Sequence, residues 1–214
     1  MLLAGEREQI VAFGRKLIEA DLTTGSGGNL SLCSRAEGLV AIKPSGVDYF
    51  EIRPEDVVVM TMDGQIVEGK LKPSSEYRFH LALLQGREDI NAVVHTHQVY
   101  ATTIACLNWE LPAVHYLVGF SGSKVPLAPY ATFGTQELSD NIVRSIGSYN
   151  ACLMANHGIV TVGASLAQAF VTAEALELVA RLYYQAKCIG QPVILPDEEM
   201  AAVVDKFKTY GQQK

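Results

Sequence analysis

Two histidines separated by one residue follow a short apolar stretch of this chain. Residues 92–97 read AVVHTH, and the β-favouring residues predict a strand that runs into His95 and His97. Side chains alternate faces along a strand, so both imidazoles are expected on the same face. Because zinc binds neutral ring nitrogens, this pair indicates part of a zinc site. The alternative interpretation is two solvated or hydrogen-bonded histidines at a strand end.

A third histidine follows another apolar segment. His157 comes after ACLMA and before Gly158, which allows a sharp turn with the imidazole pointing inward. Three histidines and one open position are typical of a catalytic zinc site. Without partners, His157 would be an ordinary turn residue. The remaining histidines, His80 and His115, are interpreted as surface or packing residues.

Glu76 is the candidate acid or base. Pro73 and two serines precede it, which predicts a helix start with Glu76 in the first turn. The helix dipole favours the ionised form of a carboxyl group at that position. Helix-end electrostatics therefore explain this acid about as well as catalysis does.

Three short segments could bind phosphate. Each offers hydroxyl groups and backbone N–H groups from a glycine-rich turn or a helix start, which bind phosphate without a large positive charge. A single SGG segment is usually only a turn, but three such segments beside a histidine set favour a site. The three segments are Ser26-Gly27-Gly28-Asn29, Ser45-Gly46 and Ser74-Ser75.

The composition is that of an ordinary globular protein. The 214 residues are 49% hydrophobic and predict one domain over residues 1–214. A net charge of -6 argues against nucleic acid as a partner. The four cysteines form no C-x-x-C pair, and no signal peptide or long apolar run is present. These features predict a cytoplasmic protein with no membrane association.

The order of elements predicts a layered α/β domain. Helices are expected near residues 6–20, 74–86, 98–107, 135–147, 165–188 and 196–209. Strands are expected near 29–35, 38–43, 57–61 and 92–97, and as two strands in 151–163 broken at residues 156–158. Turns rather than crossover helices join many of the strands. We therefore predict a three-layer α/β/α fold with a mixed, largely antiparallel central sheet.

Six motifs together resemble one protein family. SGGNLS, KPSGV, KPSSE, HTH, PYATFGT and NHG, in this order and spacing, are similar to the class II aldolase/adducin family. The similarity extends over nearly the whole chain, through the terminal KFKTYG. Within the family, the pattern is most like that of members that cleave L-fuculose 1-phosphate.

The resemblance implies a role for each motif. It implies Zn²⁺ held by His95, His97 and His157, with Glu76 as acid/base and as a metal ligand when substrate is absent. It also implies that the phosphate of dihydroxyacetone phosphate is bound by Gly28, Asn29, Ser45, Gly46, Ser74 and Ser75. On the aldehyde side the resemblance implies Tyr116 from a neighbouring subunit, a wall formed by Phe133, and a closing C-terminal Tyr210. It also implies a homotetramer with four-fold symmetry and active sites between subunits.

The implied reaction cleaves a ketose 1-phosphate, in first place L-fuculose 1-phosphate, into dihydroxyacetone phosphate and L-lactaldehyde. Zinc on the C2 carbonyl and C3 hydroxyl oxygens would stabilise an enediolate, while a carboxylate and a phenol handle the protons. The loop after Tyr116, LVGFSGSKVP, departs from the pattern of fuculose-phosphate aldolases. The resemblance therefore does not fix which aldehyde is released.

Three other functions fit parts of the pattern. An L-ribulose-5-phosphate 4-epimerase is disfavoured because residues 113–125, AVHYLVGFSGSKV, contain no acid. A dehydratase of methylthioribulose 1-phosphate stays open. A non-enzymatic adducin-like module is disfavoured because the three histidines and Glu76 are all present.

Overall fold

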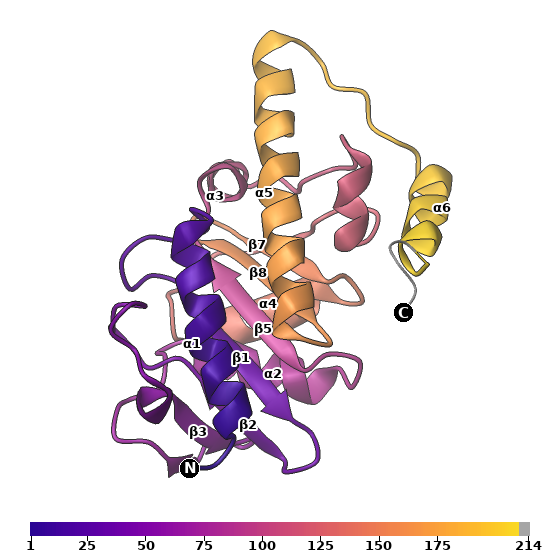
Figure 1. The fold of residues 1–214 in the computed structure, drawn as a ribbon. Coiled ribbons are helices and arrows are strands. Elements are labelled where there is room, and N and C mark those ends of the chain that lie inside the picture. The colour runs from indigo at the N-terminus through magenta and orange to yellow at the C-terminus, as the bar shows by residue number, and fades with distance from the viewer. Residues whose placement is uncertain (210–214) are drawn as a thin grey trace.

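One mixed sheet organises the chain in the computed structural model, which describes residues 1–209 (Figure 1). Its strand order is β4-β3-β2-β1-β5-β8-β7-β6. The strands are β1 (Asn29–Ser34), β2 (Leu39–Ile42), β3 (Val58–Thr61), β4 (Ile66–Glu68), β5 (Ala92–Thr96), β6 (Leu127–Ala128), β7 (Ala151–Met154) and β8 (Gly158–Gly163). The α-helices are α1 (Ala4–Glu19), α2 (Tyr77–Gly86), α3 (Val99–Cys106), α4 (Gln136–Ile146), α5 (Leu166–Ile189) and α6 (Asp197–Phe207). Two 3-10 helices are η1 (Pro54–Asp56) and η2 (Tyr116–Phe120).

Most neighbouring strands are antiparallel, as the short connections predict. The pair β6–β7 is the parallel exception among the strand pairs in the described residues. The β1–β2 and β7–β8 connections are short turns, which join antiparallel strands directly. The prediction of a mixed, largely antiparallel sheet is confirmed.

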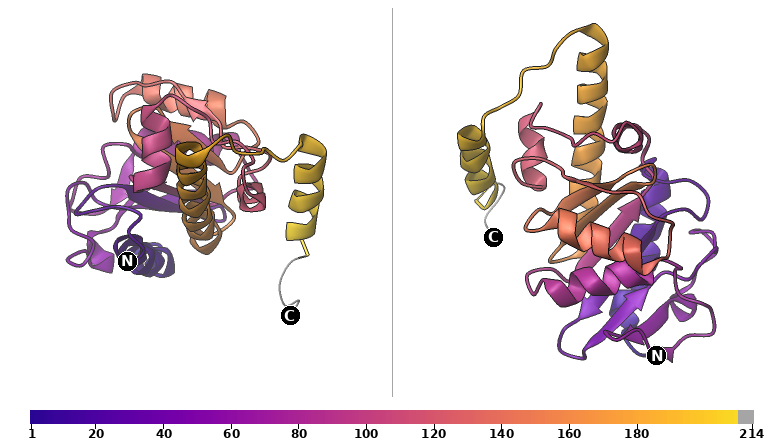
Figure 2. Two further views of the ribbon diagram at one scale, coloured as in Figure 1. Left: turned by 90° about the horizontal axis from the view of Figure 1, so that it is seen from above. Right: turned by 180° about the vertical axis from the view of Figure 1, so that it is seen from behind.

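Helices cover both faces of the sheet (Figures 1 and 2). On one face, Phe79 of α2 and Ile142 of α4 join a core with residues of β2, β3 and β8. On the other face, Leu17 of α1 and Phe170 of α5 pack against alternate residues of the same strands. This alternation puts apolar side chains on both sides of the strands, and the three-layer α/β/α fold is confirmed.

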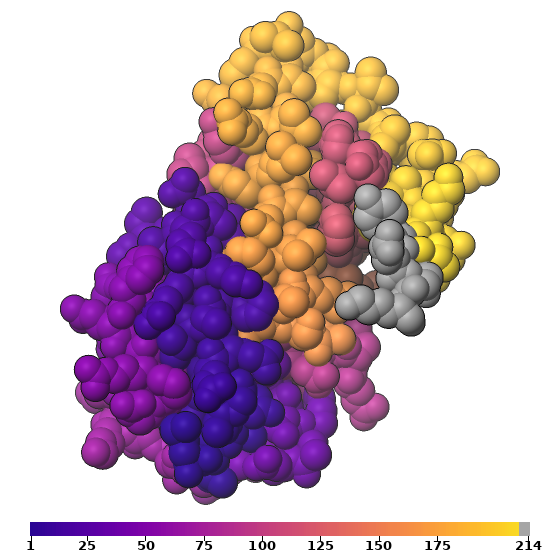
Figure 3. Space-filling model, viewed as in Figure 1, coloured from indigo at the N-terminus to yellow at the C-terminus, as the bar shows by residue number. Residues whose placement is uncertain are grey.

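The long helix α5 extends beyond the sheet. Its first half packs beside α1, and its second half packs against α3 and η2. Figure 3 shows α5 in orange across the middle of this face, next to the indigo α1. α6 follows an extended segment and contacts η2, where Met200 is fully buried. The chain between α3 and α6 therefore forms a second, smaller core at one end of the molecule.

Three local features differ from the sequence expectations. The short edge strand β4 follows the turn at Gly64, where no strand was predicted because three residues carry too little pattern. Residues Tyr116–Phe120 form a 3-10 turn rather than strand or loop. Glu76 is the residue before α2 rather than part of its first turn, because the preceding serines form a turn of their own. No helix within residues 1–209 is long and apolar enough to span a membrane.

Candidate active site

The centre of the sheet brings the predicted metal ligands together. β5 lies between β1 and β8, and the strand register places His95 opposite both Asn29 of β1 and Val160 of β8. β5 ends at Thr96, so His97 is the first residue beyond the strand. His157 lies in the tight turn that joins β7 to β8. Antiparallel pairing of β8 with β5 returns this turn to the end of β5, beside the two other histidines.

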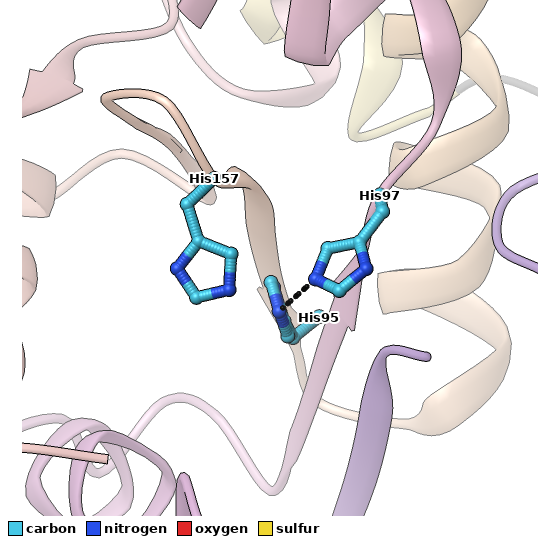
Figure 4. Close-up of side chains that lie close together, drawn as sticks. All are labelled: His95, His97 and His157. Carbon is cyan, nitrogen blue, oxygen red and sulfur yellow. Dashed lines mark hydrogen bonds between the residues drawn. The ribbon is translucent and has the colours of Figure 1, made fainter. Parts of the chain in front are cut away.

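The three imidazoles face one another (Figure 4). The Nε2 atoms of His95 and His97 are 3.0 Å apart, which confirms that the two side chains share a face. Ring nitrogens of all three histidines lie within 4.8 Å of one another. His95 is fully buried, whereas His97 is exposed and His157 is partly exposed. The cluster is therefore closed on the side of the sheet and open on the other.

The third histidine depends on an unusual turn. Asn156 has a left-handed backbone with φ 54°, which asparagine tolerates better than most residues. Gly158 then packs so closely on β5 that a Cβ atom would collide with the carbonyl oxygen of Thr96 and lie 3.0 Å from the His97 ring. Glycine at this position thus permits the close approach of the two histidine-bearing segments.

Glu76 reaches the cluster from the start of α2. Its Oε2 lies 3.3 Å from His95 Nε2, and its Oε1 lies 3.4 Å from His157 Nε2. Asn29 Nδ2–H donates to Oε2 at 2.9 Å. Oε1 is buried and has no hydrogen-bond partner among the described residues. A buried carboxylate oxygen is costly in this state unless a cation or proton compensates it.

The three imidazoles are in the neutral form that binds metals. Burial lowers the pKa of His95 to about 3 and that of His157 to about 4, and in each case a neighbouring imidazole lowers it further. Burial also lowers the pKa of His97, although Glu76 opposes this shift. His95 Nδ1–H donates to the Ile159 carbonyl oxygen at 3.0 Å, so its Nε2 carries a lone pair toward the cluster.

This set of donors fits one divalent ion. Three neutral ring nitrogens and one carboxylate converge on a common space that is partly open. Such a set with an exchangeable position is typical of catalytic rather than structural zinc sites. The orphaned Oε1 of Glu76 points to the same conclusion, because a bound cation would compensate it.

Two serine turns are paired beside the cluster. Ser45 N–H donates to the Lys72 carbonyl oxygen, and Ser74 N–H donates to the Lys43 carbonyl oxygen, each at 3.0 Å. The KPSG and KPSS segments thus form a small antiparallel bridge although they are far apart in sequence. The bridge uses the N–H groups of Ser45 and Ser74 and places the serines of both segments along one wall of a pocket.

A pocket of about 330 Å³ joins the two serine turns to the histidine cluster. All six predicted phosphate-binding residues line it, namely Gly28, Asn29, Ser45, Gly46, Ser74 and Ser75, and so do Glu76, His97, His157 and Phe133. Gly28 has φ +66°, and a Cβ atom there would lie 2.6 Å from the His95 carbonyl oxygen. The close packing of this glycine brings the SGG turn against β5.

The pocket also contains residues that the sequence analysis did not single out. The Lys43 side chain is buried, and its Nζ donates to the carbonyl oxygens of Ser26 and Pro44, each at 3.2 Å. Burial lowers the pKa of Lys43 to about 8, although Asp48 opposes this shift. Tyr130 lines the outer rim. The lysine within KPSG was the available signal, but lysine side chains are usually exposed.

Of the two interpretations of His80, the surface residue is wrong and the packing residue is confirmed, although His80 also makes hydrogen bonds that were not predicted. Its side chain is fully buried and makes hydrogen bonds to Ser31 and Asn29. The signal that could have found it is spacing, because His80 is four residues after Glu76 and thus shares its helix face.

The predicted Tyr116 is not part of the pocket of its own chain. Tyr116 lies in η2, is 48% exposed and does not line the pocket described above. Tyr210 lies outside the described residues. Phe133 lines the pocket with a largely exposed ring. Within the described residues, the structure thus brings the predicted metal ligands and the predicted phosphate-binding residues together, but not Tyr116.

The pattern of the Class II Aldolase and Adducin N-terminal domain matches residues 8–184. The chain belongs to the class II aldolase and adducin family. It is 52% identical over 213 residues to the 5-deoxy-D-ribulose 1-phosphate aldolase of Bacillus thuringiensis serovar kurstaki, with all of both chains covered. It is 40% identical over 205 residues to the L-fuculose phosphate aldolase of Escherichia coli, with 95% of this chain and 94% of that protein covered.

A solved structure supports the same assignment at the level of the fold. The structure of an L-fuculose 1-phosphate aldolase superimposes with a TM-score of 0.95 and 46% sequence identity, covering 97% of this chain and 98% of the other. Class II aldolases are metal-dependent lyases, and this chain is such an enzyme. The expected resemblance and the expected enzyme class are both confirmed.

Proposed function

We propose that this class II aldolase uses Zn²⁺ to cleave a short deoxyketose 1-phosphate into dihydroxyacetone phosphate and a methyl-bearing aldehyde. One observation carries the proposal: a single pocket joins three converging imidazoles and the Glu76 carboxylate to paired serine turns. Metal ligands next to a phosphate-binding wall are the two parts that a metal-dependent ketose-phosphate aldolase requires.

The first candidate substrate is 5-deoxy-D-ribulose 1-phosphate. The relative that bears this substrate in its name shares 52% identity over the full length, compared with 40% for the Escherichia coli fuculose-phosphate enzyme. Cleavage of its C3–C4 bond yields acetaldehyde. The pocket beyond the histidines is lined by Tyr130, Ala131 and Phe133, which suits a small aldehyde with a methyl group.

L-fuculose 1-phosphate is the second candidate, and the similarity to a solved L-fuculose 1-phosphate aldolase favours it. It differs in carrying one additional hydroxyl-bearing carbon, so that cleavage yields L-lactaldehyde. An extra hydroxyl group is discriminated strongly only where the site holds a polar partner for it. The comparison of these two substrates therefore tests the aldehyde side of the site.

His95, His97 and His157 would hold the ion, and Glu76 would be a fourth ligand when substrate is absent. A bound divalent ion supplies Lewis acidity to the oxygens beside the bond that breaks. The Glu76 carboxylate would carry the proton that is exchanged at C3 of dihydroxyacetone phosphate. Asn29 keeps the Oε2 end of that carboxylate in place through the 2.9 Å hydrogen bond.

The paired serine turns would bind the phosphate group. Ser45, Ser74 and Ser75 would offer their hydroxyl groups, and Gly46 and Ser75 their N–H groups, because the N–H groups of Ser45 and Ser74 are used in the bridge between the two turns. Gly28 and Asn29 close the wall from the SGG turn. Phosphate held there keeps the reacting carbons near the ligands and lowers the entropic barrier. Phe133 would border the aldehyde, while Tyr116 from a neighbouring subunit would exchange the proton on the aldehyde oxygen and Tyr210 would close the site.

We further propose a homotetramer in the cytoplasm. The exposed Tyr116 in η2 supports a site completed by another subunit, since Tyr116 does not reach the pocket of its own chain. All four cysteines are free thiols, which supports a reducing compartment.

The deciding experiment measures cleavage of both candidate substrates by the zinc-loaded enzyme. Release of dihydroxyacetone phosphate is expected from both, with the higher kcat/KM for 5-deoxy-D-ribulose 1-phosphate. A higher kcat/KM for L-fuculose 1-phosphate would reverse the order of substrates. Release from neither substrate would contradict the proposed function, whereas full activity after complete metal removal would contradict the role of the metal.

A further inference from the structure

A buried chain of hydrogen bonds runs from the core of the domain to Glu76. Ser31 Oγ lies 2.8 Å from His80 Nδ1, and His80 Nε2 lies 2.5 Å from Asn29 Oδ1. Asn29 Nδ2–H then donates to Glu76 Oε2 at 2.9 Å. Ser31 and His80 are fully buried, while Asn29 and Glu76 are 5% and 6% exposed. Ser31 and His80 do not line the pocket.

The chain arises from two matching spacings. Asn29 and Ser31 are two apart on β1 and point to the same face, about 6.6 Å apart along the strand. Glu76 and His80 are four apart at the start of α2, about 6 Å apart along the helix axis. The two pairs can therefore interdigitate, with each strand residue meeting a helix residue.

The chemistry of the groups allows one consistent direction of donation. An ionised carboxylate accepts only, so the Asn29 NH₂ group faces Glu76 and its Oδ1 faces His80. His80 Nε2 must then carry the proton, and Nδ1 accepts from the Ser31 hydroxyl. Burial keeps the pKa of His80 well below its ordinary value, and the nearby His95 lowers it further. With neutral His80 in this tautomer, each of the three hydrogen bonds has one donor and one acceptor.

The chain leaves the two oxygens of Glu76 in different states. Oε2 is held by Asn29, whereas Oε1 has no hydrogen-bond partner among the described residues and faces His157. The His80 ring is itself fixed by stacking on Phe79, with ring centroids 4.6 Å apart. Loss of the His80 donor would free the Asn29 amide to turn over, and its oxygen would then repel the carboxylate.

We propose that His80 is a positioning residue, anchored by Ser31, that fixes the Asn29 amide and thereby holds Oε1 of Glu76 toward His157 at the histidine cluster. The proposal rests on the proposed function, in which Glu76 moves the proton at C3. His80 acts through Asn29 and touches no substrate atom.

Substitutions at His80 separate positioning from packing. His80→Gln keeps an N–H donor near the position of Nε2, whereas His80→Leu fills similar space without a donor. The measurement is the exchange of the C3 proton of dihydroxyacetone phosphate with solvent, with no aldehyde present. His80→Leu is expected to lower kcat by about 10- to 100-fold, the usual effect of removing an outer partner. The KM and the metal content should stay near those of the wild type, and His80→Gln should regain most of the rate.

A matched pair of serines supplies the control. Ser31→Ala removes the hydroxyl group that bonds to His80 Nδ1 and should lower kcat. Ser139→Ala should leave kcat unchanged. Both serines are buried, but Ser139 lies on α4 and its hydroxyl has no partner within residues 1–209. This pair keeps the proposal testable if His80→Leu does not fold.

The outcomes distinguish the inference from the proposed function. Equal rates for His80→Leu and His80→Gln, or losses that follow only Tm or metal content, would overturn the positioning role. Absence of exchange in the wild-type enzyme would instead refute the role of Glu76. Independently of activity, ¹⁵N NMR of histidine-labelled enzyme should show neutral His80 protonated at Nε2, and protonation at Nδ1 would also overturn the inference.

Discussion

At the scale of single residues, Glu76 shows how one side chain can join two parts of a site. It lies 3.3–3.4 Å from two imidazoles and accepts a hydrogen bond from Asn29 at the phosphate side. Its position before α2, rather than within it, lets the carboxylate reach across to the end of β5. The same carboxylate can therefore contact a metal and a substrate carbon in turn.

Replacing Glu76 by Gln tests its role as proton carrier. The change keeps the size of the side chain and removes the base, so solvent exchange at C3 of dihydroxyacetone phosphate should fall by at least about 100-fold. Fold and zinc stoichiometry should be retained, because three imidazoles stay in place. Full exchange in this variant would refute the assignment.

Replacing His95 by Ala tests the ligand set. His95 is the buried member of the cluster, and its loss should remove stoichiometric zinc and activity together. Metal analysis of the purified variant measures this directly. His115→Ala is the control, since His115 caps η2 outside the cluster and should retain full metal content. An active, metal-free His95→Ala enzyme would contradict the site.

Lys43 predicts the dependence of activity on pH. The pKa of this lysine is lowered to about 8, so it is charged below that pH and neutral above it. A positive charge at the wall that binds phosphate should favour the substrate, and kcat/KM should therefore decline as the pH rises through about 8.

Lys43→Met should remove this alkaline decline and lower kcat/KM below pH 8 toward the alkaline value. Lys72→Met is the matched control, because Lys72 occupies the same place in the second KPS motif but is exposed and does not line the pocket. An unchanged pH profile in Lys43→Met would show that another group causes the decline.

At the scale of elements, close backbone approaches hold the site. The SGG turn meets β5 at Gly28, and the β7–β8 turn meets it at Gly158. Turns that carry candidate site residues therefore pack against both edges of β5. Its neighbours β1 and β8 set the register, so a shift of one residue would turn His95 to the opposite face.

Gly28→Ala should test the packing of the SGG turn. Its φ of +66° disfavours alanine by about 1–2 kcal/mol, and the added Cβ would meet the His95 carbonyl oxygen. We expect a loss of at least that size in the free energy of unfolding, together with weaker substrate binding. Denaturant unfolding and KM measure the two effects.

Gly5→Ala is the control for Gly28→Ala. Gly5 lies in α1 with no atom close enough to obstruct a Cβ, and alanine is favoured in helices by about 0.5–1 kcal/mol. This variant should lose no stability. Equal stability of the two variants would contradict the packing argument at Gly28.

At the scale of the whole molecule, one chain brings together the proposed metal ligands and phosphate-binding residues, but its own Tyr116 does not line the pocket. Tyr116 is exposed in η2, at the end of the molecule formed by α3, the second half of α5 and α6. A neighbouring subunit could place this residue at another chain's pocket. The homotetramer is thus a prediction about how the site is completed.

Mixed subunits test the shared site. Glu76→Gln and Tyr116→Phe chains should each be nearly inactive alone. Co-assembled at equal amounts, they should recover about a quarter of the wild-type activity, since that fraction of neighbouring pairs combines both intact groups. No recovery in assemblies that are proved to be mixed would show that each chain uses its own tyrosine.

Much of the fold follows from local pattern. α5 was predicted from its periodic apolar face, and β5 from its β-favouring run. β4 was missed because a three-residue edge strand is too short, and too exposed, to show an alternating apolar pattern. The 3-10 turn at Tyr116 was missed because such turns depend on surrounding packing.

The sequence by itself determined the donor types, the layered fold and the family, because motif spacing and hydrophobic period are properties of the chain. Only the tertiary structure decided the roles of His80 and Lys43. Burial and hydrogen-bond partners depend on segments far apart in sequence, as in the contacts that link Ser31, Asn29 and His80. His80 lies at the centre of a buried chain of hydrogen bonds because Asn29 and Ser31 of β1 lie opposite Glu76 and His80 at the start of α2.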